Sequence, residues 1–188
     1  MTEFVARHVG LSHADAHALQ KKYYREMGTT LAGLMAHHDV RPEDYLDHVH
    51  DVPLDSLIPE PALAAALARL PGRRLVFTNG DARHAGRVLN HLGLAELFED
   101  VFHIGSADFV PKPHPNTFDR LIRAHAIAPK TAAFFEDSEK NLAPAAALGM
   151  TTILVGPHAE ASSAPFVHHR THKLAPFLAA ARVRETAA

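Results

Sequence analysis

Three short groups of polar residues could carry out chemistry, and each follows a short apolar segment. The groups are Thr78-Asn79-Gly80, Lys112 between Pro111 and Pro113, and Glu136-Asp137. A hydroxyl followed by a glycine turn with free backbone N–H groups suits an anion. A lysine whose backbone is stiffened by proline on both sides can neutralise a phosphoryl group. Paired carboxylates are hard oxygen ligands of the kind that Mg²⁺ prefers.

Each group also has a simpler explanation. Asn79-Gly80 is a common turn sequence, and Lys112 could be an ordinary exposed loop lysine. Asp137 or Ser138 could cap the helix that follows. Taken together, a threonine, a lysine and a carboxylate pair that each end a strand are typical of phosphoryl transfer through an aspartyl phosphate.

The segments that would position these groups alternate between strand and helix after Gly72. Strands are expected at 75–77, 101–104, 132–135 and 151–155, and helices at 82–92, 115–126, 142–148 and 174–183. We expect a surface loop from 157 to 172. This alternation predicts an α/β fold in which a parallel sheet is covered by helices on both faces. Such sheets bind ligands at the carboxyl ends of their strands.

The part before residue 58 has helical signals only. Ser12 is placed to cap a helix that ends at Gly28, a second helix is expected at 30–38, and a third begins at Pro42. A proline-rich stretch at 51–61 then leads to a helix at 63–70. We therefore expect a small helical cap at 1–57 and an α/β core at 58–188.

The composition excludes several classes of function. A net charge of −2 over 188 residues argues against binding nucleic acid through a basic surface. We find no apolar run that approaches the roughly 18 residues of a membrane helix, and no secretory signal. The absence of cysteine excludes disulfides and a cysteine nucleophile and favours a cytoplasmic location. The 16 histidines are scattered, and we expect most of them to be solvated.

The sequence resembles the haloacid dehalogenase-like hydrolases, and within them the pyrimidine 5′-nucleotidase branch. The resemblance covers residues 1 to about 156. The segments that carry it are Tyr23-Tyr24-Arg25 with Gly28-Thr29-Thr30-Leu31, YLDHVHD at 45–51, FTNG at 77–80, His84 with Arg87-Val88-Leu89, VPKP at 110–113, FEDS at 135–138 with Asn141-Leu142, and Leu148-Gly149-Met150.

The resemblance implies a role for each group. Thr78 and the N–H groups of Asn79 and Gly80 would hold the phosphoryl oxygens, and Lys112 would pair with the phosphate and with the nucleophile's carboxylate. Asp137 would ligate Mg²⁺, with Glu136 in its first or second shell.

The helical cap would fold over the site, exclude water and choose the leaving group. His50 and Asp51 would lie near its hinge, where His50 either contacts the substrate or has a structural role. The implied activity is Mg²⁺-dependent hydrolysis of a small phosphate ester, with a pyrimidine nucleoside monophosphate as the expected substrate. Sugar phosphates and phosphoglycolate are alternative substrates. A non-catalytic protein that binds phosphate or a partner is an alternative function.

The family's nucleophile and general acid lie in an Asp-x-Asp motif that ends its first strand, in the middle of the sheet. No two aspartates of this sequence are separated by a single residue. We therefore expect that the first, central strand is missing and that the chain alone is inactive. Such a strand buries about four apolar side chains worth ~6–12 kcal/mol, so we also expect marginal stability. A shortened sequence or misplaced start codon is the expected explanation, and a genuinely non-catalytic relative is the alternative.

Overall fold

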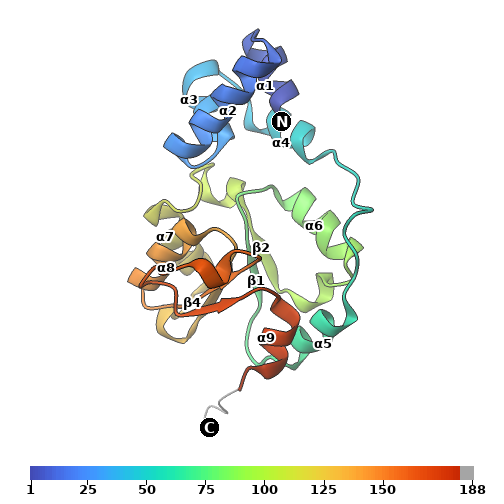
Figure 1. Cartoon of the computed structure of the whole chain (residues 1–188), viewed down its shortest axis with the longest axis vertical. Coiled ribbons are helices and arrows are strands. Elements are labelled where there is room, and N and C mark those ends of the chain that lie inside the picture. Colours follow the sequence, from blue (N-terminus) through green and yellow to red (C-terminus); the bar gives the residue numbers. More distant parts are fainter. Residues whose placement is uncertain (183–188) are drawn as a thin grey trace.

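The computed structural model describes residues 1–182 and arranges them in two groups of elements (Figure 1). The upper group contains four helices: α1 (Thr2–Val9), α2 (His13–Met27), α3 (Thr30–His38) and α4 (Pro42–His50). The lower group contains the strands and the other helices. Residues 51–60 form a helix-free connection that runs down one side between the two groups.

Capping side chains set the limits of the upper helices. The Ser12 hydroxyl accepts a hydrogen bond from the Asp15 N–H at 3.2 Å, and Gly28 ends α2 with φ of 84°. Both ends are as predicted. The prediction of three helices was incomplete, because α1 precedes them. This helix has only eight residues and no side-chain cap at its start, so its sequence signal is weak.

The upper helices enclose a small apolar core of their own. Its buried members are Phe4, Val5, Ala16, Tyr23, Leu31, Leu34, Val40, Tyr45 and Leu46, with Ile104 reaching in from the lower group. The ring of Tyr23 lies directly on Gly33, where an added Cβ would come within 2.1 Å of the ring. The close approach of α2 and α3 therefore requires glycine at this position.

The lower group is an α/β fold with parallel strands, as predicted. The strands are β1 (Leu75–Phe77), β2 (Asp100–Phe102), β3 (Ala133–Glu136), β4 (Thr151–Val155) and β5 (His169–Thr171). The helices are α5 (Pro61–Arg69), α6 (Ala82–His91), α7 (Pro115–His125), α8 (Glu139–Ala147) and α9 (Leu174–Ala180). Short 3₁₀ turns lie at Ala95–Leu97, Ile104–Ala107, Pro129–Thr131 and Ala159–Ala161.

Three predicted segments differ from the structure. The loop expected at 157–172 contains β5, whose polar sequence His-Arg-Thr carries no strand signal and whose pairing with β4 defines it. Helix α8 begins three residues before Leu142. The helix predicted at 174–183 ends at Ala180, and its last position, Val183, lies outside the described residues.

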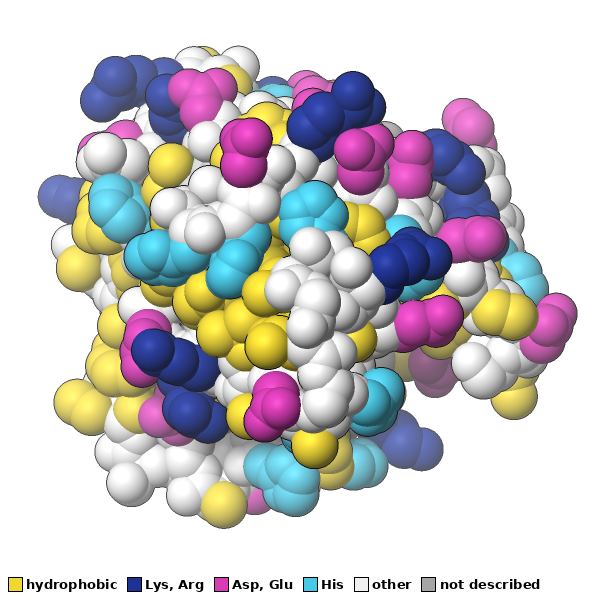
Figure 2. All heavy atoms as spheres, turned by 90° about the horizontal axis from the view of Figure 1, so that it is seen from above, with side chains coloured by type: hydrophobic (Ala, Val, Ile, Leu, Met, Phe, Trp, Pro, Cys, Tyr) yellow, Lys and Arg dark blue, Asp and Glu magenta, His cyan; other side chains and the backbone are white. Residues whose placement is uncertain are grey.

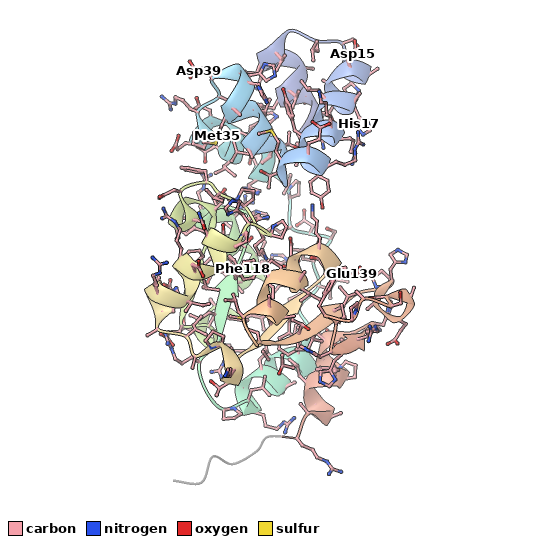
Figure 3. All side chains as sticks on the ribbon, turned by 90° about the vertical axis from the view of Figure 1, so that its left-hand side faces the viewer. Asp15, His17, Met35, Asp39, Phe118 and Glu139 are labelled. Carbon is pink, nitrogen blue, oxygen red and sulfur yellow. The ribbon has the colours of Figure 1, made fainter. Side chains whose placement is uncertain are left out.

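Helices cover both faces of the strands. Consecutive residues of β3 point to opposite faces. The ring of Phe134 packs at 5.8 Å from Phe118 of α7, whereas that of Phe135 packs at 6.1 Å from Phe177 of α9. Helices α7 and α8 therefore lie on one face, and α5, α6 and α9 on the other (Figure 1). Figure 3 shows Phe118 inside the lower group.

The strands form two separate parallel sheets, with orders β1-β2 and β3-β4-β5. The Thr78 N–H bonds to the Phe102 carbonyl, and the Thr151 N–H to the Ala132 carbonyl. Backbone groups alternate in direction along a strand. Phe77 therefore turns its N–H and C=O away from β2. Among the described residues, β1 and β3 each have one strand partner, so both have an edge without one. A missing central strand remains a prediction.

The surface carries both signs of charge. Figure 2 shows basic and acidic side chains interspersed over the face seen from above, with histidines beside apolar side chains. Within residues 1–182, the structure contains no helix with the length and hydrophobicity needed to span a membrane. The domain limits at 1–57 and 58–188 remain predictions, and residues 183–188 lie outside the described chain.

Candidate active site

The carboxyl ends of β1 and β3 open onto a cavity of about 540 Å³. Its wall consists of Tyr24, Phe77, Thr78, Asn79, Gly80, Lys112, Phe135, Glu136, Asp137, Ser138, Asn141, Val155 and Leu174. All three polar groups singled out in the sequence therefore meet at one cavity. The parallel strands explain the meeting of Thr78 and Asp137, because the carboxyl ends of β1 and β3 lie on the same side of the fold. The prediction that Lys112 also ends a strand is wrong: it lies in the loop after the 3₁₀ turn that follows β2.

Reciprocal hydrogen bonds tie the loop after β1 to the segment around Lys112. The Lys112 N–H donates to Asn79 Oδ1 at 2.8 Å, and Asn79 Nδ2 donates to the Lys112 carbonyl at 3.2 Å. The Gly80 N–H donates to Thr78 Oγ1 at 2.9 Å. The Asn79 side chain is thus a structural link between the two loops. The Thr78 hydroxyl proton and the Asn79 N–H are the groups left to face an anion.

Lys112 joins the ends of the two sheets. Its Nζ donates to the Phe77 carbonyl at 2.8 Å and to Glu136 Oε2 at 2.6 Å, and only 6% of the residue is exposed. The same ammonium lies 4.6 Å from the ring centre of Phe77 and 5.3 Å from that of Phe134. An ammonium has three donors, so one N–H of Lys112 remains for a ligand. The alternative of an ordinary exposed lysine is wrong.

The two carboxylates differ in their surroundings. Glu136 is buried and accepts from Lys112 and, at 3.1 Å, from the Ser138 N–H. Asp137 is exposed on the cavity wall. Ser138 precedes α8 but makes no capping hydrogen bond through its side chain, so the capping alternative is wrong for Ser138. Asp137 is therefore the carboxylate of the pair that is available to a ligand.

The oxygen donors at the cavity partly fit a divalent cation. Asn141 is buried, lines the cavity, and leaves its Oδ1 without a hydrogen-bond partner. Amide and carboxylate oxygens suit Mg²⁺, which also retains several waters. Within residues 1–182, no group of three histidine, aspartate or glutamate side chains could hold a metal ion. Asp137 and Asn141 could therefore supply part of a magnesium shell, and other ligands would have to complete it.

The two residues expected near the hinge lie outside the cavity wall. His50 is the last residue of α4, and its Nδ1 hydrogen-bonds to Asp81 at the start of α6. Asp51 follows it and is exposed. No sequence signal indicates the contact between His50 and Asp81, because they are 31 positions apart and Asp81 fits a helix cap.

Tyr24 is a cavity residue that our sequence reasoning did not assign to the site. It projects from α2, and Lys140 of α8 places its Nζ 4.2 Å from the centre of the tyrosine ring. The helical spacing that buries Tyr23 turns Tyr24 outward, so the sequence alone marks Tyr24 as a surface residue. The structure instead places it where the cap meets the cavity.

Comparison with known proteins agrees with this geometry. Residues 4–149 match the family model of the haloacid dehalogenase-like hydrolases. The chain belongs to the haloacid dehalogenase-like hydrolase family.

The individual proteins that the chain resembles share less than a third of its sequence. The chain is 27% identical over 172 residues to Phosphate metabolism protein 8 of Saccharomyces cerevisiae, a match that covers 82% of this chain and 53% of the yeast protein. The chain thus spans about half the length of this curated relative. A phosphatase of the family from Thermococcus onnurineus has a TM-score of 0.59 at 18% identity, covering 91% of this chain and 81% of the other. A haloacid dehalogenase-like protein from Streptococcus pneumoniae has a TM-score of 0.60 at 12% identity, covering 95% and 87%. These two structures support the fold.

Proposed function

We propose that the whole protein is a Mg²⁺-dependent phosphate monoester hydrolase, with a pyrimidine nucleoside monophosphate as its substrate. The observation that carries the proposal is the meeting of Thr78, Lys112 and Asp137 at one cavity, at the carboxyl ends of β1 and β3. A hydroxyl, an ammonium and a free carboxylate at this point suit a phosphate and a divalent cation. The name of the yeast relative, Phosphate metabolism protein 8, supports the same class of substrate.

The residues of this chain would bind and orient the phosphate. The Thr78 hydroxyl and the Asn79 N–H would donate to its oxygens, and the third N–H of Lys112 would add a charge-assisted hydrogen bond. Glu136 fixes the position of the Lys112 ammonium at the cavity wall through their hydrogen bond of 2.6 Å. Asn79 holds the two loops at a fixed separation.

Asp137 and Asn141 would hold part of the magnesium shell. The cation, when bound, would offset the negative charge on the phosphoryl oxygens.

The nucleophile would come from a strand that this chain does not contain. We propose that an extended segment ending in Asp-x-Asp lies between β1 and β3 in the whole protein and forms the aspartyl phosphate. The unpaired edges of both strands, and the bonds of Lys112 to the Phe77 carbonyl and to Glu136, support this position.

The cap would select the leaving group. Tyr24 supplies an aromatic ring at the cavity wall, and aromatic rings pack well against planar groups such as a pyrimidine base. Small aliphatic esters such as phosphoglycolate would not use this contact. The ring therefore supports a nucleoside monophosphate over the alternative substrates.

The test is phosphate release by the whole protein with Mg²⁺, using uridine and cytidine monophosphates, sugar phosphates and phosphoglycolate as substrates. We expect Lys112→Ala to lower kcat by about 10²–10³-fold. Lys22→Ala, on the exposed surface of α2, is the matched control and should retain full activity.

If the wild-type protein releases phosphate no faster than the Lys112→Ala variant does, the proposal is wrong. Phosphate binding by the whole protein without any release would favour the non-catalytic alternative.

A further inference from the structure

The cap and the α/β core are joined by a set of polar contacts that the proposed hydrolysis does not use. We call them the cap latch. They are the ion pair of Asp47 with Arg83 at 2.9 Å, the hydrogen bond of His50 with Asp81, and the bonds from Arg87 to the carbonyls of His50 and Val52 at 2.9 and 3.0 Å. All of them join the end of α4, or the residues after it, to α6 or to its N-cap residue Asp81.

The imidazole of His50 lies against the loop that follows β1. A Cβ added at Gly80 would be 3.5 Å from His50 Nε2 and 3.3 Å from Thr78 Oγ1. The ring and the threonine hydroxyl therefore flank the same point of the backbone. The other side of the ring is stacked on His84, with centroids 4.3 Å apart and planes within 6°. His50 is thus held between the start of α6 and the Thr78–Gly80 loop.

The surroundings of this pair of imidazoles shift the pKa values of Asp81 and His84. Burial alone would raise the pKa of Asp81, but the hydrogen bonds from the His84 N–H and from His50 hold it below its usual value. Burial lowers the pKa of His84, and the positive charge of His50 lowers it further. His84 also leaves its buried Nδ1 without a partner. Both shifts favour an ionised Asp81 and a neutral His84 beside the ring of His50.

The remaining charged groups around His50 are already paired. Arg83 bonds to Asp47, and Arg87 bonds to backbone carbonyls, including that of His50 itself. Together with Asp81 and His84 they make up the wall of the small hollow around the ring. His50 is consequently the imidazole of the cap latch that lies between the Asp81 carboxylate and the Thr78–Gly80 loop.

We propose that His50 is a positioning residue of the Thr78–Gly80 loop, held by Asp81 and stacked on His84, which places a cap-borne positive charge beside the loop when it binds a phosphate dianion. The inference rests on the proposed function, because that function assigns the phosphate to this loop. Since linkage is reciprocal, protonation of His50 strengthens anion binding and anion binding favours protonation by the same factor. The contact couples cap closure to occupancy of the loop.

The first test needs no ligand. We expect the backbone amide signal of Gly80 to move in NMR spectra of the chain as the pH falls from 8 to 5.5, in step with the ring signals of His50. In His50→Gln this movement should disappear. The matched control is His91→Gln, because His91 also lies on α6 and bonds a carbonyl near the cap, that of Leu57, at 2.8 Å. Unchanged movement of the Gly80 signal in His50→Gln would overturn the proposal.

The second test measures anion affinity by calorimetry with inorganic sulfate, a dianion that does not titrate in this range. Binding to the wild type and to His91→Gln should tighten by about tenfold between pH 8 and pH 6, whereas binding to His50→Gln should change little. Equal pH dependence in wild type and His50→Gln overturns this inference alone and leaves the proposed function standing. Failure of the wild-type chain to bind sulfate at either pH also overturns this inference, whereas the proposed function is tested separately by phosphate release from the whole protein.

Discussion

Lys112 and Glu136 form a buried ion pair that connects the two sheets. Their side chains are 7% and 6% exposed, and Nζ lies 2.6 Å from Oε2. Removing one member of a buried pair leaves the other charge without a partner, which costs about 3–5 kcal/mol. We expect Lys112→Met to lower the free energy of unfolding by about that amount, as measured by urea denaturation.

The matched control is the double variant Lys112→Met/Glu136→Gln, which removes both charges. Replacing a whole buried pair is often close to neutral, so this variant should recover most of the loss. A double variant as unstable as the single one would show that the charge pairing is not what stabilises this position.

The partly buried imidazole of His84 makes stability depend on pH. Its pKa in the folded state is lowered, by burial and by the charge of His50, below the usual value of 6.5. Below pH 6.5 the unfolded chain therefore takes up a proton that the folded chain resists. The stabilising contribution of neutral His84 is present above pH 6.5 and is lost as the pH falls toward the lowered value.

We expect the free energy of unfolding to decrease between pH 7.5 and pH 5.5, and to decrease less in His84→Gln. Urea denaturation at both pH values measures the difference. His91→Gln supplies the comparison for loss of a partly exposed histidine from the same helix. An identical pH dependence in wild type and His84→Gln would refute this assignment.

Individual site residues could be predicted from the sequence where they directly follow an expected strand. Thr78 and Asp137 directly follow β1 and β3, and parallel strands bring such ends together. Lys112 was also expected to end a strand, which is wrong, because it lies ten residues after Phe102, the last residue of β2. The partners of these residues were not predictable. Nothing in the sequence indicates that Asn79 would bond across 33 positions to Lys112, or that Tyr24 would reach the cavity from the cap. Such contacts depend on how loops and helices meet in three dimensions.

Helices α2 and α3 meet through the Tyr23 ring and Gly33. A Cβ at position 33 would come within 2.1 Å of the ring, so Gly33→Ala must displace Tyr23 or separate the helices. Overpacking of this kind costs about 1–3 kcal/mol. We expect a loss of that size in the free energy of unfolding, together with weakening of the hydrogen bond of 2.7 Å from Tyr23 to His38.

Gly86→Ala provides the matched control for this prediction. Gly86 lies within α6, and a Cβ there meets no atom within 4 Å. Alanine at an unstrained helical position stabilises by about 0.4–1 kcal/mol. The two glycine variants should therefore shift the urea midpoint in opposite directions, and a loss of stability in both would contradict the packing argument.

Elements with clear boundary signals were predicted within a few residues, whereas those defined by pairing were missed. Proline at the start of α4 and glycine after α2 fix helix ends locally. Strand β5 has the sequence His-Arg-Thr and exists because β4 offers it an edge. A three-residue polar strand contains no periodicity of its own, so only the assembled sheet reveals it.

At the scale of the whole molecule, β1 and β3 each have one edge without a strand partner among residues 1–182. Alternation along β1 and β3 turns the N–H groups of Leu75, Phe77, Ala133 and Phe135 away from their single partner strands. The Lys112 ammonium donates a hydrogen bond to the carbonyl of Phe77. An ammonium cannot accept a hydrogen bond, so it leaves the N–H groups of these strands without a partner. These four amides should therefore exchange with solvent through local opening, at least about tenfold faster than the amide of Ile153 in β4, which has strand partners on both sides.

A peptide that completes the sheet should change this pattern selectively. We expect a synthetic segment of five apolar residues followed by Asp-x-Asp to slow exchange at Leu75, Phe77, Ala133 and Phe135, because each would gain a ladder partner. The amide of Arg170, which points outward from the far edge of β5, should exchange at the same rate with and without the peptide. The same peptide with its apolar residues replaced by serine is the control for non-specific association. If the four amides exchange equally fast with either peptide, the space between β1 and β3 is not the place of a strand, and the nucleophile of the proposed hydrolase would have to reach the cavity by another route.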